Sequence, residues 1–124
     1  MISMKNTKNK PNSGYPDIIT HLPEAEVPVA GGKAWILQSE AQQLVFFEFA
    51  ANLKLPNHSH SYPQWGMVVE GKMELTVNGE PRVYQKGSEY LVPAGASHCA
   101  RFLEKSRVID FFSEKSRYKP KPTQ

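Results

Sequence analysis

Three histidines and one glutamine have the residue types and the spacing of a metal site. His58, His60 and Gln64 lie close together, and His98 follows much later in the chain. Imidazole nitrogens and amide oxygens are good ligands for divalent first-row transition metals. His58 and His60 are two residues apart, so in an extended strand both rings would point to the same face. The pattern therefore predicts one site for a single divalent metal, held by all four residues.

The predicted ligand set is neutral, and this has chemical consequences. Four protein ligands leave one or two coordination positions open, as in catalytic metal sites. Because Gln64 carries no charge, the metal keeps nearly its full 2+ charge, polarises a carbonyl or hydroxyl strongly, and attracts an anionic substrate. Zinc, nickel, manganese, iron and copper all accept these ligands. A second interpretation of Gln64 is that it orients a ligand by a hydrogen bond without binding the metal.

Short runs typical of β-strands must position these residues. Asn78-Gly79 predicts a two-residue hairpin turn, because both types tolerate positive φ. Pro93 ends a strand and Gly95 allows a tight reversal, so that His98 begins the next strand facing inward. No window of 11 or more residues has a helical period, and many short strands predict an all-β sandwich or small barrel. The predicted strands are 33–39, 43–53, 66–69, 73–77, 82–85, 89–92, 99–103 and 107–112.

The chain of 124 residues is long enough for one domain. We expect a disordered N-terminal arm over 1–16, a folded domain over 17–117 and a flexible tail over 118–124. No apolar run of about 18 residues is present, which excludes a membrane-spanning helix. Met1 to Gly14 lacks the apolar stretch of a secretory signal. The single cysteine, Cys99, cannot form an internal disulfide, and these features together favour a cytoplasmic protein.

The formal net charge of +3 comes from the two ends of the chain. Between residues 11 and 113 there are 8 basic and 11 acidic residues, a net charge of −3 for the expected domain. Nucleic-acid binding needs a basic face on the folded part. The charge pattern therefore argues against a nucleic-acid partner and favours a small-molecule ligand.

The two segments that carry the histidines resemble the two motifs of the cupins. They read His58-x-His60-x3-Gln64-x6-Gly71 and Gly87-x5-Pro93-x-Gly95-x2-His98, and the resemblance covers about residues 40–112. It implies a single-domain, all-β double-stranded β-helix jelly roll, with one metal inside and usually a homodimer. Two positions depart from the pattern. Gln64 replaces the usual glutamate ligand, and Phe102 stands where an asparagine often follows the last histidine.

A narrower resemblance is to small single-domain cupins of the pectin-degradation type. Those proteins also carry His-x-His, then Gln, then His, and end with a segment like 109–113 of this chain. There the metal helps to open the ring of 4,5-unsaturated galacturonate, assisted by an acidic residue, a phenylalanine and an arginine. The resemblance implies a role in carbohydrate metabolism. It makes Asp110 and Arg117 the catalytic candidates and Phe112 a substrate contact, and Tyr62 is a further candidate at the pocket rim.

Several alternatives remain open at this point. Asp110 alternates with Val108 and Phe112, so it either faces the cavity as a general base or faces water at a sheet edge. The leading hypothesis for function is an isomerase or lyase acting on a small anionic sugar or keto acid. The alternatives are a metal-dependent dioxygenase and a non-catalytic sensor or ligand-binding module. His21 and Cys99 are interpreted as structural or solvated residues.

Overall fold

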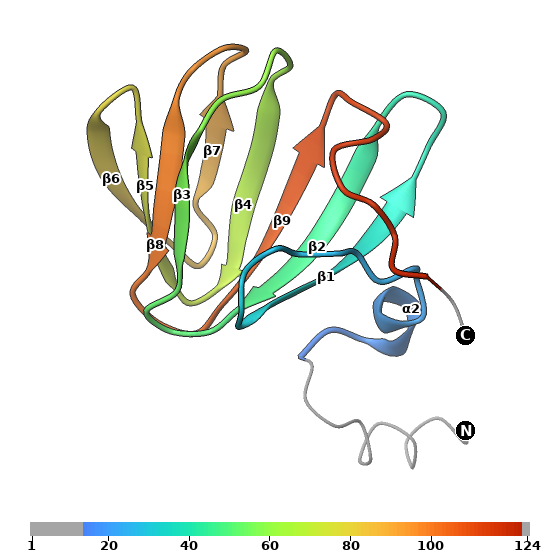
Figure 1. Cartoon of the computed structure of the whole chain (residues 1–124). Helices are drawn as coiled ribbons and strands as arrows, with labels where there is room; N and C mark the ends of the chain where they lie inside the picture. Colours follow the sequence, from blue (N-terminus) through green and yellow to red (C-terminus); the bar gives the residue numbers. More distant parts are fainter. Residues whose placement is uncertain (1–13, 123–124) are drawn as a thin grey trace.

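The computed structural model describes residues 14–122, which form two facing antiparallel β-sheets (Figure 1). The elements in chain order are α2 (Asp17–Thr20), β1 (Gly32–Gln38), β2 (Gln43–Phe49), β3 (Lys54–His58), β4 (Gln64–Glu70), β5 (Lys72–Val77), β6 (Glu80–Gln85), β7 (Glu89–Val92), β8 (His98–Phe102) and β9 (Ser106–Phe112).

The larger sheet has the strand order β1-β2-β9-β4-β7, and the smaller has β3-β8-β5-β6. The chain crosses from one sheet to the other several times, as in a double-stranded β-helix jelly roll. This confirms the predicted all-β class. The one helix of the described residues is the four-residue α2, in agreement with the lack of a helical period.

The two turns predicted from the sequence, at Asn78-Gly79 and at Gly95, are present in the structure. Asn78 and Gly79 have φ of 49° and 83°, and they join β5 to β6 with Val77 opposite Glu80. Strand β7 ends at Val92, directly before Pro93, and Gly95 has φ of 79° in the reversal that follows. These local constraints place the start of β8 at His98.

One strand prediction was wrong. The run 43–53 is not a single strand: β2 ends at Phe49, and the chain turns through Asn52, whose φ is 70°. Residues 54–58, which were not predicted, form β3 and pair with β8. This strand was not predicted from the sequence, because it contains Pro56 and Asn57, and both residue types are depleted in β-strands.

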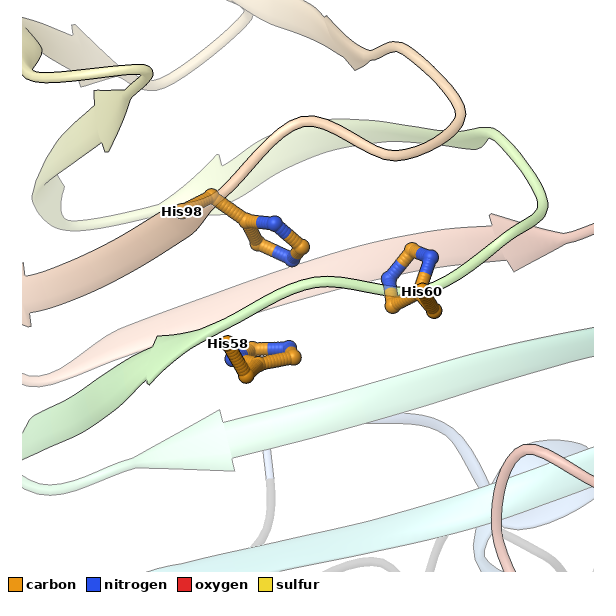
Figure 2. Close-up of side chains that lie close together, drawn as sticks. All are labelled: His58, His60 and His98. Carbon is orange, nitrogen blue, oxygen red and sulfur yellow. The ribbon is translucent and has the colours of Figure 1, made fainter.

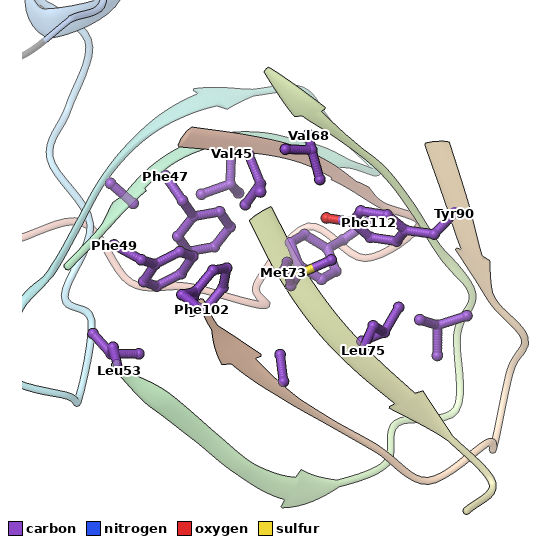
Figure 3. Packing of buried hydrophobic residues seen from close by; sticks show 14 of the residues in the cluster. Val45, Phe47, Phe49, Leu53, Val68, Met73, Leu75, Tyr90, Phe102 and Phe112 are labelled. Carbon is purple, nitrogen blue, oxygen red and sulfur yellow. The ribbon is translucent and has the colours of Figure 1, made fainter. Parts of the chain in front are cut away.

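Large side chains from both sheets fill the interior (Figure 3). The rings of Phe47 and Phe49 stack with centroids 5.0 Å apart, and Phe49 stacks on Phe102 of the opposite sheet at 4.3 Å. All three side chains are almost fully buried. Aromatic pairs of this kind add to the stability that apolar burial provides, so this cluster holds the two sheets together.

Folded contacts extend beyond the expected domain boundaries at 17 and 117. The buried Tyr15 hydroxyl donates hydrogen bonds to the backbone oxygens of Phe47 at 2.9 Å and Val108 at 3.2 Å. The backbone N–H of Tyr118 donates to Gln43 Oε1 at 3.0 Å. Residues 15 and 118 are therefore part of the packed structure. The remaining expectations for 1–13 and 123–124 lie outside the described residues.

We predict that Gly71→Ala destabilises the fold far more than Gly87→Ala. Both glycines have positive φ, 95° and 89°, which costs a non-glycine residue about 1–2 kcal/mol. A Cβ at Gly71 would also collide with Ser106 Oγ and the Lys105 carbonyl, whereas a Cβ at Gly87 meets nothing within 4 Å. Urea denaturation should therefore show a loss of roughly 2–4 kcal/mol for Gly71→Ala and about 1 kcal/mol for Gly87→Ala. Equal losses would contradict this account of the β4–β5 turn.

Candidate metal centre

His58 and His98 meet because their strands are hydrogen-bonded neighbours. They are register partners on β3 and β8, and their ring centroids lie 4.1 Å apart. His60 lies beyond the end of β3, so the prediction that His58 and His60 share one strand was wrong. Its loop is instead held by the N–H of Gly95, which donates to the His60 carbonyl at 2.8 Å. Ligating nitrogens of the three histidines all lie within 4.8 Å of one another (Figure 2).

The Nδ1 atom of each histidine ring is hydrogen-bonded to a backbone carbonyl, which fixes the orientation of the ring. A carbonyl can only accept, so each Nδ1 carries a proton, and in the neutral imidazole Nε2 then presents a lone pair. This arrangement is the common way in which proteins orient metal-binding imidazoles. The three Nδ1-to-oxygen distances are 2.9 Å for His58 to Pro56, 2.7 Å for His60 to Tyr62 and 3.0 Å for His98 to Ala96.

Burial keeps two of these rings neutral. It lowers the pKa of His98 to about 4, and it lowers the pKa of His58 as well. His98 Nε2 is buried and has no hydrogen-bond partner among the described residues. Buried polar atoms without a partner are rare and call for an explanation. A metal ion bound to this atom would satisfy it.

Gln64 supplies the fourth candidate ligand from the opposite sheet. It is the first residue of β4, it is buried, and its Oε1 lies 3.2 Å from His60 Nε2. Because the His60 proton is on Nδ1, both of these facing atoms are acceptors. A cation between them would satisfy both. The residues present therefore fit a divalent metal held by His58, His60, Gln64 and His98.

Asp110 faces the interior of the barrel, so the alternative of a water-facing charge at a sheet edge is wrong. Its side chain is buried, and its Oδ1 accepts a hydrogen bond of 2.6 Å from the Tyr90 hydroxyl. Gln64 is a diagonal neighbour of Asp110 on the paired strands β4 and β9, because it lies two residues before Gly66, the register partner of Asp110. Burial raises the pKa of Asp110 to about 6, while Tyr90 and Gln64 oppose the rise. Asp110 is thus connected to the metal ligands through Gln64.

Arg117 places a positive charge beside the histidine cluster. Its guanidinium lies 4.5 Å from the Tyr118 ring and 5.6 Å from the Phe112 ring, and one of its terminal nitrogens is 3.4 Å from His58 Nε2. Within the described part of the chain, Arg117 forms no ion pair with a carboxylate, and its Nε is buried without a partner. The site therefore holds a cation that makes no direct ion pair among the described residues, although its charge lowers the pKa of Asp110 in the same cavity.

Both candidate substrate contacts, Tyr62 and Phe112, lie beside His60 and beside each other. The Tyr62 ring stacks on His60 with centroids 4.3 Å apart, and the buried Phe112 ring meets His60 edge-on at 6.1 Å. Phe112 and Arg117 line a cavity between the sheets that also contains His58, Gln64, His98 and Asp110. This cavity offers about 40 Å³ to the centres of water molecules, which is room for a few waters or a small ligand.

Two residues of the site were missed by the sequence interpretation. Tyr90 precedes an outward-facing residue and alternates with Val92 toward the interior, so strict alternation along strand 89–92 would have indicated its inward side chain. Tyr118, which packs on Arg117, was placed in the flexible tail. No periodic pattern marks it, because it follows the last strand.

A jelly roll with a histidine cluster at one end of the barrel defines a class of metal-binding β-barrel proteins. Residues 45–112, more than half of the chain, match the family described as Cupin domain. The chain therefore belongs to the cupin family.

None of the curated proteins compared with it matches. In the described part of the chain, no helix has the length and apolar character needed to cross a membrane.

Solved structures extend this comparison. The chain is similar to KdgF from Halomonas sp., with 28% identity and a TM-score of 0.69 over 75% of this chain and 87% of that one. A RmlC-like cupin from Shewanella frigidimarina has 24% identity and a TM-score of 0.72, over 86% of this chain and 95% of that one. Oxalate decarboxylase from Bacillus subtilis has 17% identity and a TM-score of 0.69, over 79% of this chain and 29% of that one. The last two likenesses show the fold alone.

We predict that the protein binds one divalent metal, and that His58→Ala and His98→Ala each weaken binding by at least about 100-fold. Metal binding to the folded state should also raise the melting temperature of the wild type. The measurements are elemental analysis after dialysis and thermal unfolding with and without added zinc or nickel. His21→Ala, an exposed histidine outside the cluster, is the matched control. Full metal retention by the double variant of His58 and His98 would rule out the site.

Proposed function

We propose that this cupin is a metal-dependent isomerase or lyase that acts on a small anionic sugar or keto acid. The observation that carries the proposal is the Arg117 guanidinium, which forms no carboxylate ion pair within residues 14–122 and lies 3.4 Å from His58 Nε2. A half-buried cation beside a cluster of neutral metal ligands favours an anionic ligand. A substrate carboxylate would be such a ligand.

The residues of the site would have separate roles in substrate binding, substrate orientation and metal binding. Arg117 would bind the substrate carboxylate through two parallel N–H donors, the geometry that distinguishes arginine from lysine. The rings of Phe112 and Tyr118 flank the guanidinium, and they would restrict its orientation and exclude water. A divalent metal on the four neutral ligands would supply Lewis-acid polarisation of a substrate carbonyl or hydroxyl.

Two resemblances support a sugar acid as the substrate within this class. The motifs and the segment around Asp110 and Phe112 resemble the pectin-degradation cupins, and the structure is similar to KdgF from Halomonas sp.. A place in cytoplasmic carbohydrate metabolism belongs to the same proposal. A metal-dependent dioxygenase is the second candidate, because imidazole ligands also suit iron. Oxygen consumption by the iron-loaded protein would favour it.

We predict that the zinc-loaded protein binds D-galacturonate or pyruvate but not the neutral sugar D-galactose, because only the anions neutralise Arg117. Arg117→Ala should weaken anion binding by about 10–100-fold, the usual loss when a charged hydrogen-bond partner is removed. Arg117→Lys should recover only part of it, since lysine cannot bind bidentately. Calorimetric titration gives these affinities, and Arg101→Ala on the outer surface is the control. Equal binding of galactose and galacturonate, or unchanged binding by Arg117→Ala, would refute the role of Arg117.

We also infer that the homodimer expected from the resemblance forms through the outer face of the larger sheet. Five apolar side chains lie in register on that face, one on each strand. We call this set the apolar row, and its members in strand order are Leu37, Leu44, Phe111, Trp65 and Leu91. Leu37, Trp65 and Leu91 are 50%, 51% and 49% exposed. The outer face of the smaller sheet instead carries the Glu74–Arg101 ion pair, as expected of a face that contacts water.

A second copy of the chain is the occupant that fits the apolar row. Its middle member, Phe111, lies on β9, the central strand of five. A two-fold axis at this strand would place each half of the row on the opposite half of the partner. An exposed patch of several hundred Å² is typical of an interaction site. With its polar rim, it would approach the ~1,200 Å² of total area that stable interfaces bury.

We predict that Leu91→Glu converts the dimer into a monomer, because it would bury an unpaired charge in the interface. Val83→Glu is the matched control: Val83 is 54% exposed but lies opposite Glu74 on the smaller sheet, so this variant should remain dimeric. Sedimentation equilibrium measures the mass, and circular dichroism checks that both variants fold. A monomeric wild type, or a dimeric Leu91→Glu variant, would contradict the proposed interface. A wild-type monomer that dimerises on deletion of residues 1–13 would show that this segment covers the row.

A further inference from the structure

We infer that Asp110 is a positioning residue that turns the amide of Gln64 so that its oxygen faces the metal position. The inference rests on the metal site of the proposed function. It assigns Asp110 a role through Gln64, in addition to the general-base role that its inward position allows. The evidence is the 2.6 Å hydrogen bond from Tyr90 to Asp110, the position of Gln64 beside Asp110 on the paired strands β4 and β9, and the contact of Gln64 with His60.

The first of these features fixes the carboxylate. Asp110, Gly66 and Tyr90 lie side by side on β9, β4 and β7, because Gly66 is the register partner of both other residues. A Cβ on Gly66 would collide with Asp110 Oδ1 and with the Tyr90 ring. Only glycine leaves room for the 2.6 Å hydrogen bond from the Tyr90 hydroxyl to Oδ1. The carboxylate is thereby held in one orientation within the barrel.

The second feature fixes the amide. An ionised carboxylate has acceptors only, so the Nε2 hydrogens are the part of the Gln64 amide that can face Asp110 favourably, in agreement with the lowering effect of Gln64 on the pKa of Asp110. The amide oxygen then points away from Asp110. The assignment of oxygen and nitrogen in a glutamine follows from its partners in this way. The opposite orientation would place the amide oxygen against the carboxylate, which is unfavourable.

The third feature connects the amide to the metal position. Gln64 Oε1 lies 3.2 Å from His60 Nε2, the nitrogen that lacks a proton because Nδ1 donates to Tyr62. In this orientation an amide oxygen, and not an NH2 group, joins the three imidazole nitrogens. An NH2 group does not bind a divalent cation, so the metal affinity should depend on the orientation that Asp110 imposes. Partners of this kind typically contribute 10–100-fold to metal affinity.

The test compares variants of Asp110 in the full-length protein at pH 8. Asp110→Leu removes the acceptor, while Asp110→Asn keeps one oxygen that can accept from Gln64. Glu74→Leu is the matched control, because it removes a carboxylate from the outer face of the smaller sheet and should leave zinc affinity unchanged. The readouts are zinc affinity, from competition with a chromophoric chelator, and the visible spectrum of the cobalt-loaded protein, which depends on coordination geometry.

Asp110→Leu should bind zinc about 10–100-fold more weakly and change the cobalt spectrum. Asp110→Asn should recover part of both.

A double-mutant cycle separates orientation from simple charge. In a Gln64→Ala background there is no amide to orient, so Asp110→Leu should have little further effect on zinc affinity. If the lost charge alone weakened binding, the same fold-loss would persist in that background, and the inference would be overturned. Unchanged zinc affinity and cobalt spectrum in Asp110→Leu would also overturn it. Failure of the wild type to bind zinc or cobalt would instead remove the proposed metal site itself.

Discussion

The structure depends on four electron-pair donors that face one another at one end of the barrel. Three imidazole Nε2 atoms and one amide oxygen converge there, and each histidine proton is committed to a backbone carbonyl on the outer side. Acceptors do not stabilise one another, so this arrangement is favourable only with a cation among them. Among the described residues, Arg117 brings a positive charge to 3.4 Å from His58 Nε2.

The jelly roll supports this arrangement because the ligands come from both sheets. His58 and His98 are partners across β3 and β8 of the smaller sheet, while Gln64 begins β4 of the larger one. The stacked Phe49 and Phe102 hold the same two sheets together further along the barrel. Separation of the sheets would therefore pull the ligands apart, and a bound metal would in turn link the sheets. We expect metal binding and folding to be coupled for this reason.

Local signals in the sequence were sufficient for the fold class and for the choice of candidate ligands. The Asn78-Gly79 turn and the reversal at Gly95 act through their own φ preferences, which no tertiary contact has to supply. Strand β3 escaped prediction because its Pro56 and Asn57 conceal the alternation. The Asp110–Tyr90 hydrogen bond could not be predicted either, since it needs the register of three strands and the missing Cβ of Gly66.

The charges of the site explain why a neutral glutamine suits it. A divalent metal would bring 2+, Arg117 adds one positive charge, and Asp110, when ionised, contributes one negative charge to the same cavity. A glutamate at position 64 would lie against the Asp110 carboxylate and repel it. Gln64 avoids this repulsion, because its amide can donate to Asp110 and still offer an oxygen to the metal. The site therefore keeps an excess of positive charge in a poorly solvated cavity, and an anionic substrate is the ligand that neutralises it.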